Sequence, residues 1–250
     1  MKRSFLVGDR PTLVSMVQGK SPERIRELMR LSLADGAEAF GMQFCQLPAA
    51  FRTPEVYRDL FSAASPLPTY VTNYRNCENA GKDDDTLAAE LIELASCGAT
   101  LCDVMGDYFA HCEGELTVDP FAIQKQQILI DRIHDEGAQV LMSSHIRKFT
   151  PAERVLEIAL EHQRRGADIC KIVTGASTMA EQIENLRIIT LLKETLDIPF
   201  LFLSGGECHL LRRVGGELGS CMYLCVHEHD ELATKVQPLL RDVRAIRDHF

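Results

Sequence analysis

The sequence repeats one pattern eight times: a short apolar or β-branched run, then a loop, then an amphipathic helical stretch. Each run is too short for a typical helix and lacks helical periodicity, which favours a strand. The runs expected to be strands are Pro11–Val17, Ala37–Phe44, Pro68–Tyr74, Ala99–Val104, Ala138–Ser144, Ala167–Val173, Pro199–Ser204 and Ser220–Val226. The stretches expected to be helices are Ser21–Ala34, Pro54–Ala63, Asp84–Cys97, Pro120–Glu136, Pro151–Arg165, Met179–Leu196, Glu207–Leu218 and Glu231–His249.

The regular alternation of strands and helices indicates the fold class. It predicts parallel strands joined by right-handed crossovers, and eight such units in 250 residues predict closure into a barrel. We therefore expect an α/β protein built as a single (β/α)₈ barrel, with residues 1–250 in one domain because no linker or low-complexity segment interrupts them. A doubly wound open sheet is the alternative, but no glycine-rich phosphate fingerprint follows the first strand.

Residues at the expected helix ends agree with this division of the chain. Ser21 and Thr150 each precede a proline, which predicts a capping hydroxyl followed by proline at the first helical position. Five glycines follow a helix directly and precede a strand, where a residue with positive φ ends the helix. These are Gly36, Gly98, Gly137, Gly166 and Gly219.

Composition excludes several classes of partner. The formal net charge of −9 argues against nucleic acid or an anionic membrane surface as the main partner. No apolar run approaches the roughly 18 residues of a membrane span, and residues 1–10 contain no apolar signal-peptide core, so we expect a cytoplasmic protein. The nine cysteines include no CxxC pair, and we expect them to be reduced core residues rather than zinc ligands.

Lys171 is the most informative residue for function. In a (β/α)₈ barrel the active site lies at the carboxyl ends of the strands, and Lys171 lies inside the apolar strand Ala167–Val173. Burying an ammonium group is costly, so a lysine in this place needs a physical reason. One reason is an amine of lowered pKa that condenses with a ketone or aldehyde; the alternatives are a side chain that extends along the strand end to solvent or pairs with a carboxylate.

His145 favours the catalytic interpretation of Lys171. It ends the preceding strand, so we expect it to neighbour Lys171 across one strand spacing of about 5 Å. An imidazole titrates near neutral pH and can move protons during imine formation and removal of an α-proton. A single histidine at a strand end is more often a hydrogen-bonded structural residue, but the pairing with a strand lysine makes acid/base catalysis the better interpretation.

Several segments resemble the type I 3-dehydroquinate dehydratase family. Ser143–Pro151 is similar to a family run in which a histidine leads to a Thr-Pro helix start, and Gly166–Ile172 is similar to the family's Ala-Asp-Ile-x-Lys-Ile strand. Weaker similarity covers the end of the third strand, an aspartate in the fourth strand, an arginine pair before Gly-Glu, and the start of the last strand. These lie at Thr72–Arg75, Asp103, Leu211–Glu217 and Gly219–Ser220.

The resemblance implies a class I aldolase-like TIM barrel and a specific lyase chemistry. Lys171 would form an imine with the ketone of 3-dehydroquinate, and His145 would be the general acid/base that yields 3-dehydroshikimate, without a cofactor. Arg213 would bind the substrate carboxylate, although the adjacent Arg212 leaves that assignment open. The remaining substrate-binding candidates are Arg75, Glu78, Gln43 and Asp103. The implied partner is a small cyclic ketone that bears a carboxylate, in a homodimer of the shikimate pathway.

The sequence also departs from the family pattern. Gly41-Met42-Gln43 stands where the family has a glutamate and an arginine after the second strand, and Met105 replaces a glutamate after the fourth-strand aspartate. The family's substrate-covering Ser-Ala-Pro-Gly-Gln loop has no counterpart after the last strand, where this chain has His227–Glu231. These changes predict a divergent member whose substrate recognition differs.

Three other functions stay open at this point. The first is a class I lyase or aldolase that forms the same imine with a different keto acid or sugar. The second is a metal-dependent barrel, because several possible ligands fall at the expected active face: Asp103, Asp107, His145, His209, His227 and His229. The third is a non-catalytic barrel that retains Lys171 only by descent.

Overall fold

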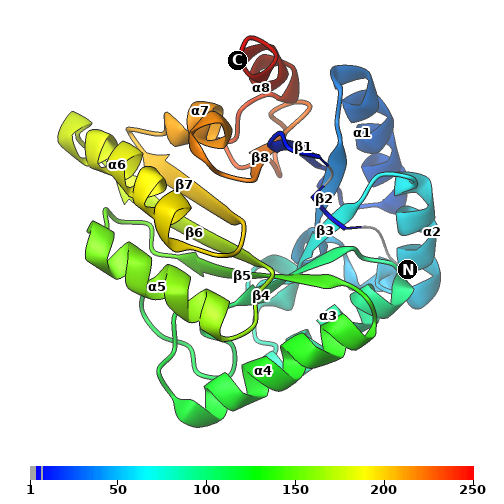
Figure 1. Ribbon diagram of the computed structural model, residues 1–250. Coiled ribbons are helices and arrows are strands. Elements are labelled where there is room, and N and C mark those ends of the chain that lie inside the picture. The colour runs from blue at the N-terminus through cyan, green and yellow to red at the C-terminus, as the bar shows by residue number, and fades with distance from the viewer. Residues whose placement is uncertain (1–3, 7) are drawn as a thin grey trace.

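Eight parallel strands form one sheet that curves into a nearly closed barrel, with the helices outside it (Figure 1). The computed structural model describes residues 4–6 and 8–250. The strands are β1 (Thr12–Met16), β2 (Ala39–Gln43), β3 (Thr69–Thr72), β4 (Leu101–Met105), β5 (Gln139–His145), β6 (Ile169–Ala176), β7 (Phe200–Gly206) and β8 (Met222–Cys225). They are paired in the order β7-β6-β5-β4-β3-β2-β1-β8. The backbone N–H of Cys221 donates to the carbonyl of Phe200 at 2.8 Å, which brings the start of β8 beside β7. The predicted (β/α)₈ barrel is confirmed.

The helices alternate with the strands as the repeat predicts. They are α1 (Pro22–Asp35), α2 (Pro54–Ala64), α3 (Asp84–Cys97), α4 (Pro120–Asp135), α5 (Ala152–Arg164), α6 (Met179–Thr195), α7 (Leu211–Leu218) and α8 (Leu240–Arg247). Short 3₁₀ turns lie in the loops after β2 and β3, at Phe44–Gln46, Ala49–Phe51 and Cys77–Asn79. Within the described ranges no helix is both long and apolar enough to cross a lipid bilayer. The expectation about residues 1–10 partly concerns Met1–Arg3 and Val7, which lie outside the described residues.

The barrel interior is a layer of side chains contributed by every strand. Successive residues of a strand point to opposite faces, and the inward set packs into one apolar cluster enclosed by the sheet. Its strand members include Val14, Ala39, Tyr70, Leu101, Leu141, Ile169, Leu201 and Met222. The opposite faces of the strands pack against the helices. Because the interior is filled at this level, the polar side chains of the candidate site gather above it, toward the carboxyl ends of the strands.

The predicted helix ends are confirmed at all positions but one. Ser21 caps α1 by accepting a hydrogen bond from the backbone N–H of Arg24, and the five predicted glycines all have positive φ. The prediction for Thr150 is wrong, because Pro151 is itself the capping residue of α5. The Thr150 hydroxyl donates to the carbonyl of Lys148 at 3.2 Å instead, which stabilises the loop before the helix.

Two helices begin later than the sequence pattern predicts. The segment before α7 is held by β6, since the N–H of Cys208 donates to the Ala176 carbonyl at 3.1 Å. The expected helix Glu231–His249 begins only at Leu240. Before it, Leu239 forms a parallel bridge with Val226, so residues 231–239 follow the barrel rim as a loop. In both cases pairing with distant backbone outweighs local helical preference.

Candidate active site

The side chain of Lys171 is buried in a polar cluster above the apolar barrel interior. Strand β6 carries it inward, and the residue is only 4% exposed. Its Nζ lies 3.1 Å from Oδ2 of Asp103, 2.9 Å from the hydroxyl oxygen of Tyr70 and 2.8 Å from that of Tyr74. An ammonium group has three N–H donors, so each has an acceptor. The buried lysine predicted from the sequence is confirmed, and it also has the carboxylate partner that the alternative interpretation proposed.

Asp103 is the negative centre of this cluster. Both tyrosine hydroxyls donate to its Oδ2, that of Tyr74 at 2.6 Å, and Ser143 donates to its Oδ1 at 2.5 Å. Burial by itself raises the pKa of Asp103, but the charge of Lys171 and these hydrogen bonds outweigh it and lower that pKa. Asp103 is therefore a carboxylate, and the three acceptors around Nζ of Lys171 match the three donors of an ammonium group. Burial and the adjacent Asp103 charge raise the pKa of both tyrosines well above 10, which keeps them protonated.

His145 lies at the end of β5, farther toward the barrel mouth than Lys171. The sheet register pairs Lys171 with Ser143 and pairs His145 with Val173. The two residues are therefore offset along the strands, and the expectation that His145 directly neighbours Lys171 across one strand spacing is wrong. Tyr74 contacts both residues. Its hydroxyl contacts Lys171, and its ring packs edge-on against the His145 ring with centroids 5.3 Å apart.

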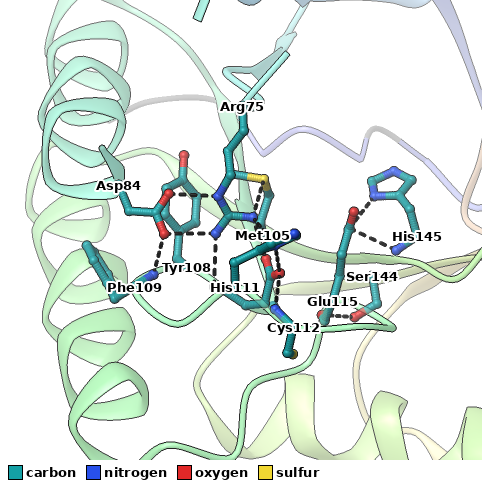
Figure 2. Close-up of polar contacts among 12 residues, drawn as sticks. Arg75, Asp84, Met105, Tyr108, Phe109, His111, Cys112, Glu115, Ser144 and His145 are labelled. Carbon is teal, nitrogen blue, oxygen red and sulfur yellow. Dashed lines mark hydrogen bonds and ion pairs between the residues drawn. The ribbon is translucent and has the colours of Figure 1, made fainter. Parts of the chain in front are cut away.

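Glu115 fixes the orientation of His145. Figure 2 shows its carboxylate beside the backbone nitrogen and one ring nitrogen of His145: Oε2 lies 2.9 Å from the backbone N and 2.7 Å from Nδ1. The backbone carbonyl of Glu115 accepts a hydrogen bond from the Ser144 hydroxyl at 2.6 Å. An Nδ1–H that donates to a carboxylate leaves Nε2 without a proton and able to accept one. Glu115 was not predicted from the sequence.

A second polar network lies at the rim around Arg75 (Figure 2). The guanidinium makes a bidentate pair with Asp84, at 2.7 and 2.8 Å, and a further bond of 2.7 Å to Asp107. Asp107 also accepts from His111 and from the backbone of Cys112. Two carboxylates thus balance Arg75, and the network joins the loops that follow β3 and β4. The geometry gives Arg75 a clear structural role beside its predicted substrate role.

The two adjacent arginines of α7 occupy different environments. Arg212 is buried, and its Nε donates to the backbone carbonyl of Ser204 at 2.9 Å. Burial, and then the charge of Arg213, lower the pKa of Arg212 to about 10. Arg213 is half-buried, and among the described residues its guanidinium has no hydrogen-bond or ion-pair partner. These environments favour Arg213 over Arg212 for binding an anion.

The other predicted binding residues are Gln43 and Glu78. Gln43 ends β2 and is half-buried at the barrel mouth, where the register pairs it with Thr72. Glu78 lies in the 3₁₀ turn Cys77–Asn79 and is exposed. Neither side chain has a hydrogen-bond partner within the part of the chain that is described, so both stay predictions as substrate ligands.

The residues proposed as a metal site do not come together. His227 pairs with Asp35 at 2.6 Å, and His229 hydrogen-bonds to the backbone carbonyl of Gln237 at 2.8 Å. His209 contacts the carbonyl of Gly206 at 3.2 Å. In residues 4–6 and 8–250 no group of three or more His, Cys, Asp or Glu side chains has an arrangement that holds a metal ion.

The fold and the site define a (β/α)₈-barrel protein with a buried, ion-paired lysine below a carboxylate-bound histidine at the carboxyl ends of its strands. The family model described as type I 3-dehydroquinase matches residues 52–247, and the chain therefore belongs to that family.

Individual relatives support the same family and fold. The 3-dehydroquinate dehydratase of Alkaliphilus oremlandii (strain OhILAs) is 33% identical over 92 residues, which is 36% of this chain and 36% of that protein. The match thus spans about a third of the curated relative's length.

Two solved structures cover almost the whole chain. The 3-dehydroquinate dehydratase from Geobacillus kaustophilus HTA426 has a TM-score of 0.83 at 14% identity and covers 98% of this chain and 92% of its own. The type I enzyme from Clostridium difficile, solved with covalently modified comenic acid, has a TM-score of 0.80 at 16% identity and covers 100% of this chain and 98% of its own. At these identities the structures show the shared fold.

Proposed function

We propose that this protein is a hydro-lyase that converts 3-dehydroquinate to 3-dehydroshikimate through an imine on Lys171. The observation that carries the proposal is the position of Lys171 in a barrel of the type I 3-dehydroquinase family: a buried amine at the carboxyl ends of the strands, paired with Asp103 at 3.1 Å. A protonated imine is a cation, so the carboxylate that balances the ammonium group in the resting site can balance the imine as well.

His145 is the proposed acid/base group for the elimination. With its Nδ1 on Glu115, Nε2 accepts the proton next to the imine carbon, and the electrons of that C–H bond move toward the imine nitrogen. As the C–O bond of the β-hydroxyl breaks, the imidazolium returns the proton and water leaves. Hydrolysis of the imine then releases a conjugated enone and restores the lysine.

Arg213 is the proposed ligand of the substrate carboxylate. Its guanidinium has no protein partner among the described residues, and an arginine binds a carboxylate through two parallel hydrogen bonds. Gln43, Glu78 and Arg75 are retained as proposed contacts to the rest of the substrate. The homodimer implied by the family resemblance also stays a prediction, which light scattering of the purified protein tests.

Absorbance of the enone product during incubation with 3-dehydroquinate tests the proposed reaction. The wild-type protein is expected to form it, and both Lys171→Ala and His145→Ala are expected to lose turnover. His134→Ala is the matched control, because that histidine pairs with Asp168 on the outer surface. Wild-type protein that forms no product would exclude this substrate.

A second candidate is the same imine chemistry on a different keto acid or sugar. Two observations favour it: Arg75 is engaged by Asp84 and Asp107, and Gln43 stands where the family resemblance expects a charged residue. A panel of keto acids with borohydride distinguishes the two candidates. A covalent adduct with another compound, but none with 3-dehydroquinate, would favour this second function.

A further inference from the structure

Two tyrosines touch the same two atoms of the site, but they occupy different positions. Tyr70 and Tyr74 both contact Nζ of Lys171, and both donate to Oδ2 of Asp103. Tyr70 is completely buried in the barrel interior, with its ring against Phe5. Tyr74 follows the end of β3, is half-buried, and lies against the ring of His145. Only Tyr74 therefore lies on the side from which a substrate reaches the lysine.

Imine formation on Lys171 requires two protons to leave its nitrogen. The resting ammonium group holds three, directed at Tyr70, Tyr74 and Asp103. A protonated imine retains one N–H, and the water that leaves contains the ketone oxygen and two protons. The overall step is ammonium plus ketone giving protonated imine plus water, so both protons must be carried from the nitrogen to that oxygen.

We propose that Tyr74 is a catalytic residue that delivers a proton to the carbinolamine oxygen during imine formation on Lys171. The proposal rests on the function proposed above. Asp103 first takes one proton from Lys171, and the neutral amine adds to the ketone: a C–N bond forms, and the C=O electron pair moves to oxygen. A second proton passes from nitrogen to that oxygen and gives the carbinolamine.

Protonation of Asp103 reverses its hydrogen bond with Tyr74. The acid now donates to the phenol oxygen, and the phenol O–H is released to point at the carbinolamine. As the C–O bond breaks, Tyr74 gives its proton to the departing oxygen and receives the proton of Asp103. The nitrogen lone pair forms the C=N bond, water leaves, and Asp103 is again a carboxylate beside the cationic imine. No other reactant is needed.

The positions of the neighbouring groups favour Tyr74 for this step. The carbinolamine oxygen is two bonds from Nζ, and the Tyr74 hydroxyl is 2.8 Å from Nζ. Tyr70 makes the same contacts from the closed interior. His145 has no hydrogen bond to Lys171 within the described residues, and it is offset by two residues in the sheet register. The high pKa of Tyr74, which is raised by burial, favours simultaneous gain and loss of a proton over a free phenolate.

The two halves of the reaction then use different residues. Tyr74 and Asp103 serve imine formation, and His145 with Glu115 serves the elimination. Imine formation is measured by the rate at which 3-dehydroquinate and borohydride give an adduct of increased intact mass, and elimination by enone absorbance.

The test compares five proteins in both measurements: wild type, Tyr70→Phe, Tyr74→Phe, His145→Ala and Tyr108→Phe. A sixth protein, Tyr74→Ala, is used for chemical rescue. Tyr74→Phe keeps the ring against His145 and removes only the hydroxyl. Tyr108→Phe is the matched control, because Tyr108 is fully buried and donates to the carbonyl of Asn73, outside the Lys171 cluster. We expect Tyr74→Phe to slow adduct formation about 100-fold, His145→Ala to form adduct without product, and Tyr108→Phe to resemble wild type.

The outcomes separate the two proposals. Wild type that forms neither adduct nor product contradicts the proposed function itself. Wild type that forms both, with adduct formation unchanged in Tyr74→Phe, overturns the role of Tyr74 alone. An equal loss in Tyr70→Phe and Tyr74→Phe also overturns it, because both phenols would then only hold the lysine. In Tyr74→Ala, rescue of adduct formation by added phenol but not by toluene supports proton delivery, and equal effects of the two contradict it.

Discussion

Oε2 of Glu115 accepts two hydrogen bonds from a single residue, His145: one from the backbone N–H at 2.9 Å and one involving Nδ1 at 2.7 Å. Glu115 reaches this position from the loop between β4 and α4 with a φ of 49°, in the left-handed region that few residues other than glycine adopt. Its own carbonyl is held by Ser144, the residue before His145. The carboxylate therefore sets both the ring orientation and the tautomer of the proposed general acid/base.

Substitution of Glu115 is expected to reduce turnover more than substrate binding. In Glu115→Ala the imidazole loses its orientation and the charge that stabilises the imidazolium, so kcat should fall by about 100-fold or more. Glu115→Gln retains an acceptor without charge and should lose less. Steady-state kinetics give kcat and KM separately. Glu113→Gln is the control, because Glu113 pairs with Lys148 on the exposed surface; an equal loss in the control would exclude a specific role for Glu115.

The buried pair of Asp103 and Lys171 is expected to behave as a coupled unit in stability. Asp103→Leu leaves a buried ammonium without its counterion, which should lower the free energy of unfolding by about 3–5 kcal/mol. Adding Lys171→Met should recover most of that loss, and urea unfolding of the single and double variants measures the coupling. The exposed pair of Asp85 and Lys125 is the comparison, for which Asp85→Asn should change stability by less than about 1 kcal/mol. Additive effects at Asp103 and Lys171 would contradict a coupled pair.

His162 is expected to make the protein sensitive to acid. Burial, and then the charge of Arg165, lower the pKa of His162 to about 3, whereas the unfolded chain has a value near 6.5. The unfolded state therefore binds the proton first, so this contribution to stability is complete above about pH 6.5 and is lost as the pH falls toward 3. From this group alone the slope is up to about 1.4 kcal/mol per pH unit.

Urea unfolding between pH 6.5 and 4 measures that slope. His162→Gln should flatten it, although the variant also loses hydrogen bonds to Ser144 and Cys170. His134→Gln is the control: a hydrogen bond to Asp168 raises the pKa of His134, so its contribution is complete below about pH 6.5 and is lost only as the pH rises. An unchanged slope in His162→Gln would assign the acid sensitivity to other groups.

The two arginines of α7 should separate binding from stability. Loss of a charge-assisted pair costs about 1.5–3 kcal/mol, so Arg213→Ala should raise KM for 3-dehydroquinate about 10- to 100-fold with little change in thermal stability. Arg212→Ala should mainly lower the unfolding temperature, because its guanidinium is buried on the carbonyl of Ser204. Kinetics and thermal melting of both variants test this, and the reverse pattern would assign the carboxylate to Arg212.

The fold could be predicted because the strand–helix repeat and the glycines that end its helices are both visible in the local sequence. Gly36 and Gly98, for example, end helices with positive φ as the pattern indicates. The errors lie where distant backbone competes with local preference. Residues 231–239 have helical composition, but Leu239 forms a parallel bridge with Val226, which directly follows β8. No local pattern reveals that contact.

Lys171 and His145 of the candidate site were named from the sequence, whereas Glu115, Tyr70 and Tyr74 were missed. Lys171 and His145 could be found because strand ends meet at one face of a barrel. Glu115 lies in an irregular loop whose course depends on Ser144 and His145, and its sequence context has no periodicity to interpret. Tyr70 could have been found from the sequence. Strand alternation directs its side chain into the barrel interior, directly below Lys171.

The most direct test of the central claim is the intact mass of the protein after incubation with 3-dehydroquinate and borohydride. An imine on Lys171 predicts a covalent adduct in the wild type, with the modified peptide containing residue 171, and no adduct in Lys171→Ala. The chemistry also predicts enone absorbance in the wild type without borohydride. Wild-type protein that shows neither adduct nor enone, or an adduct that persists in Lys171→Ala, would contradict the proposed role of this lysine.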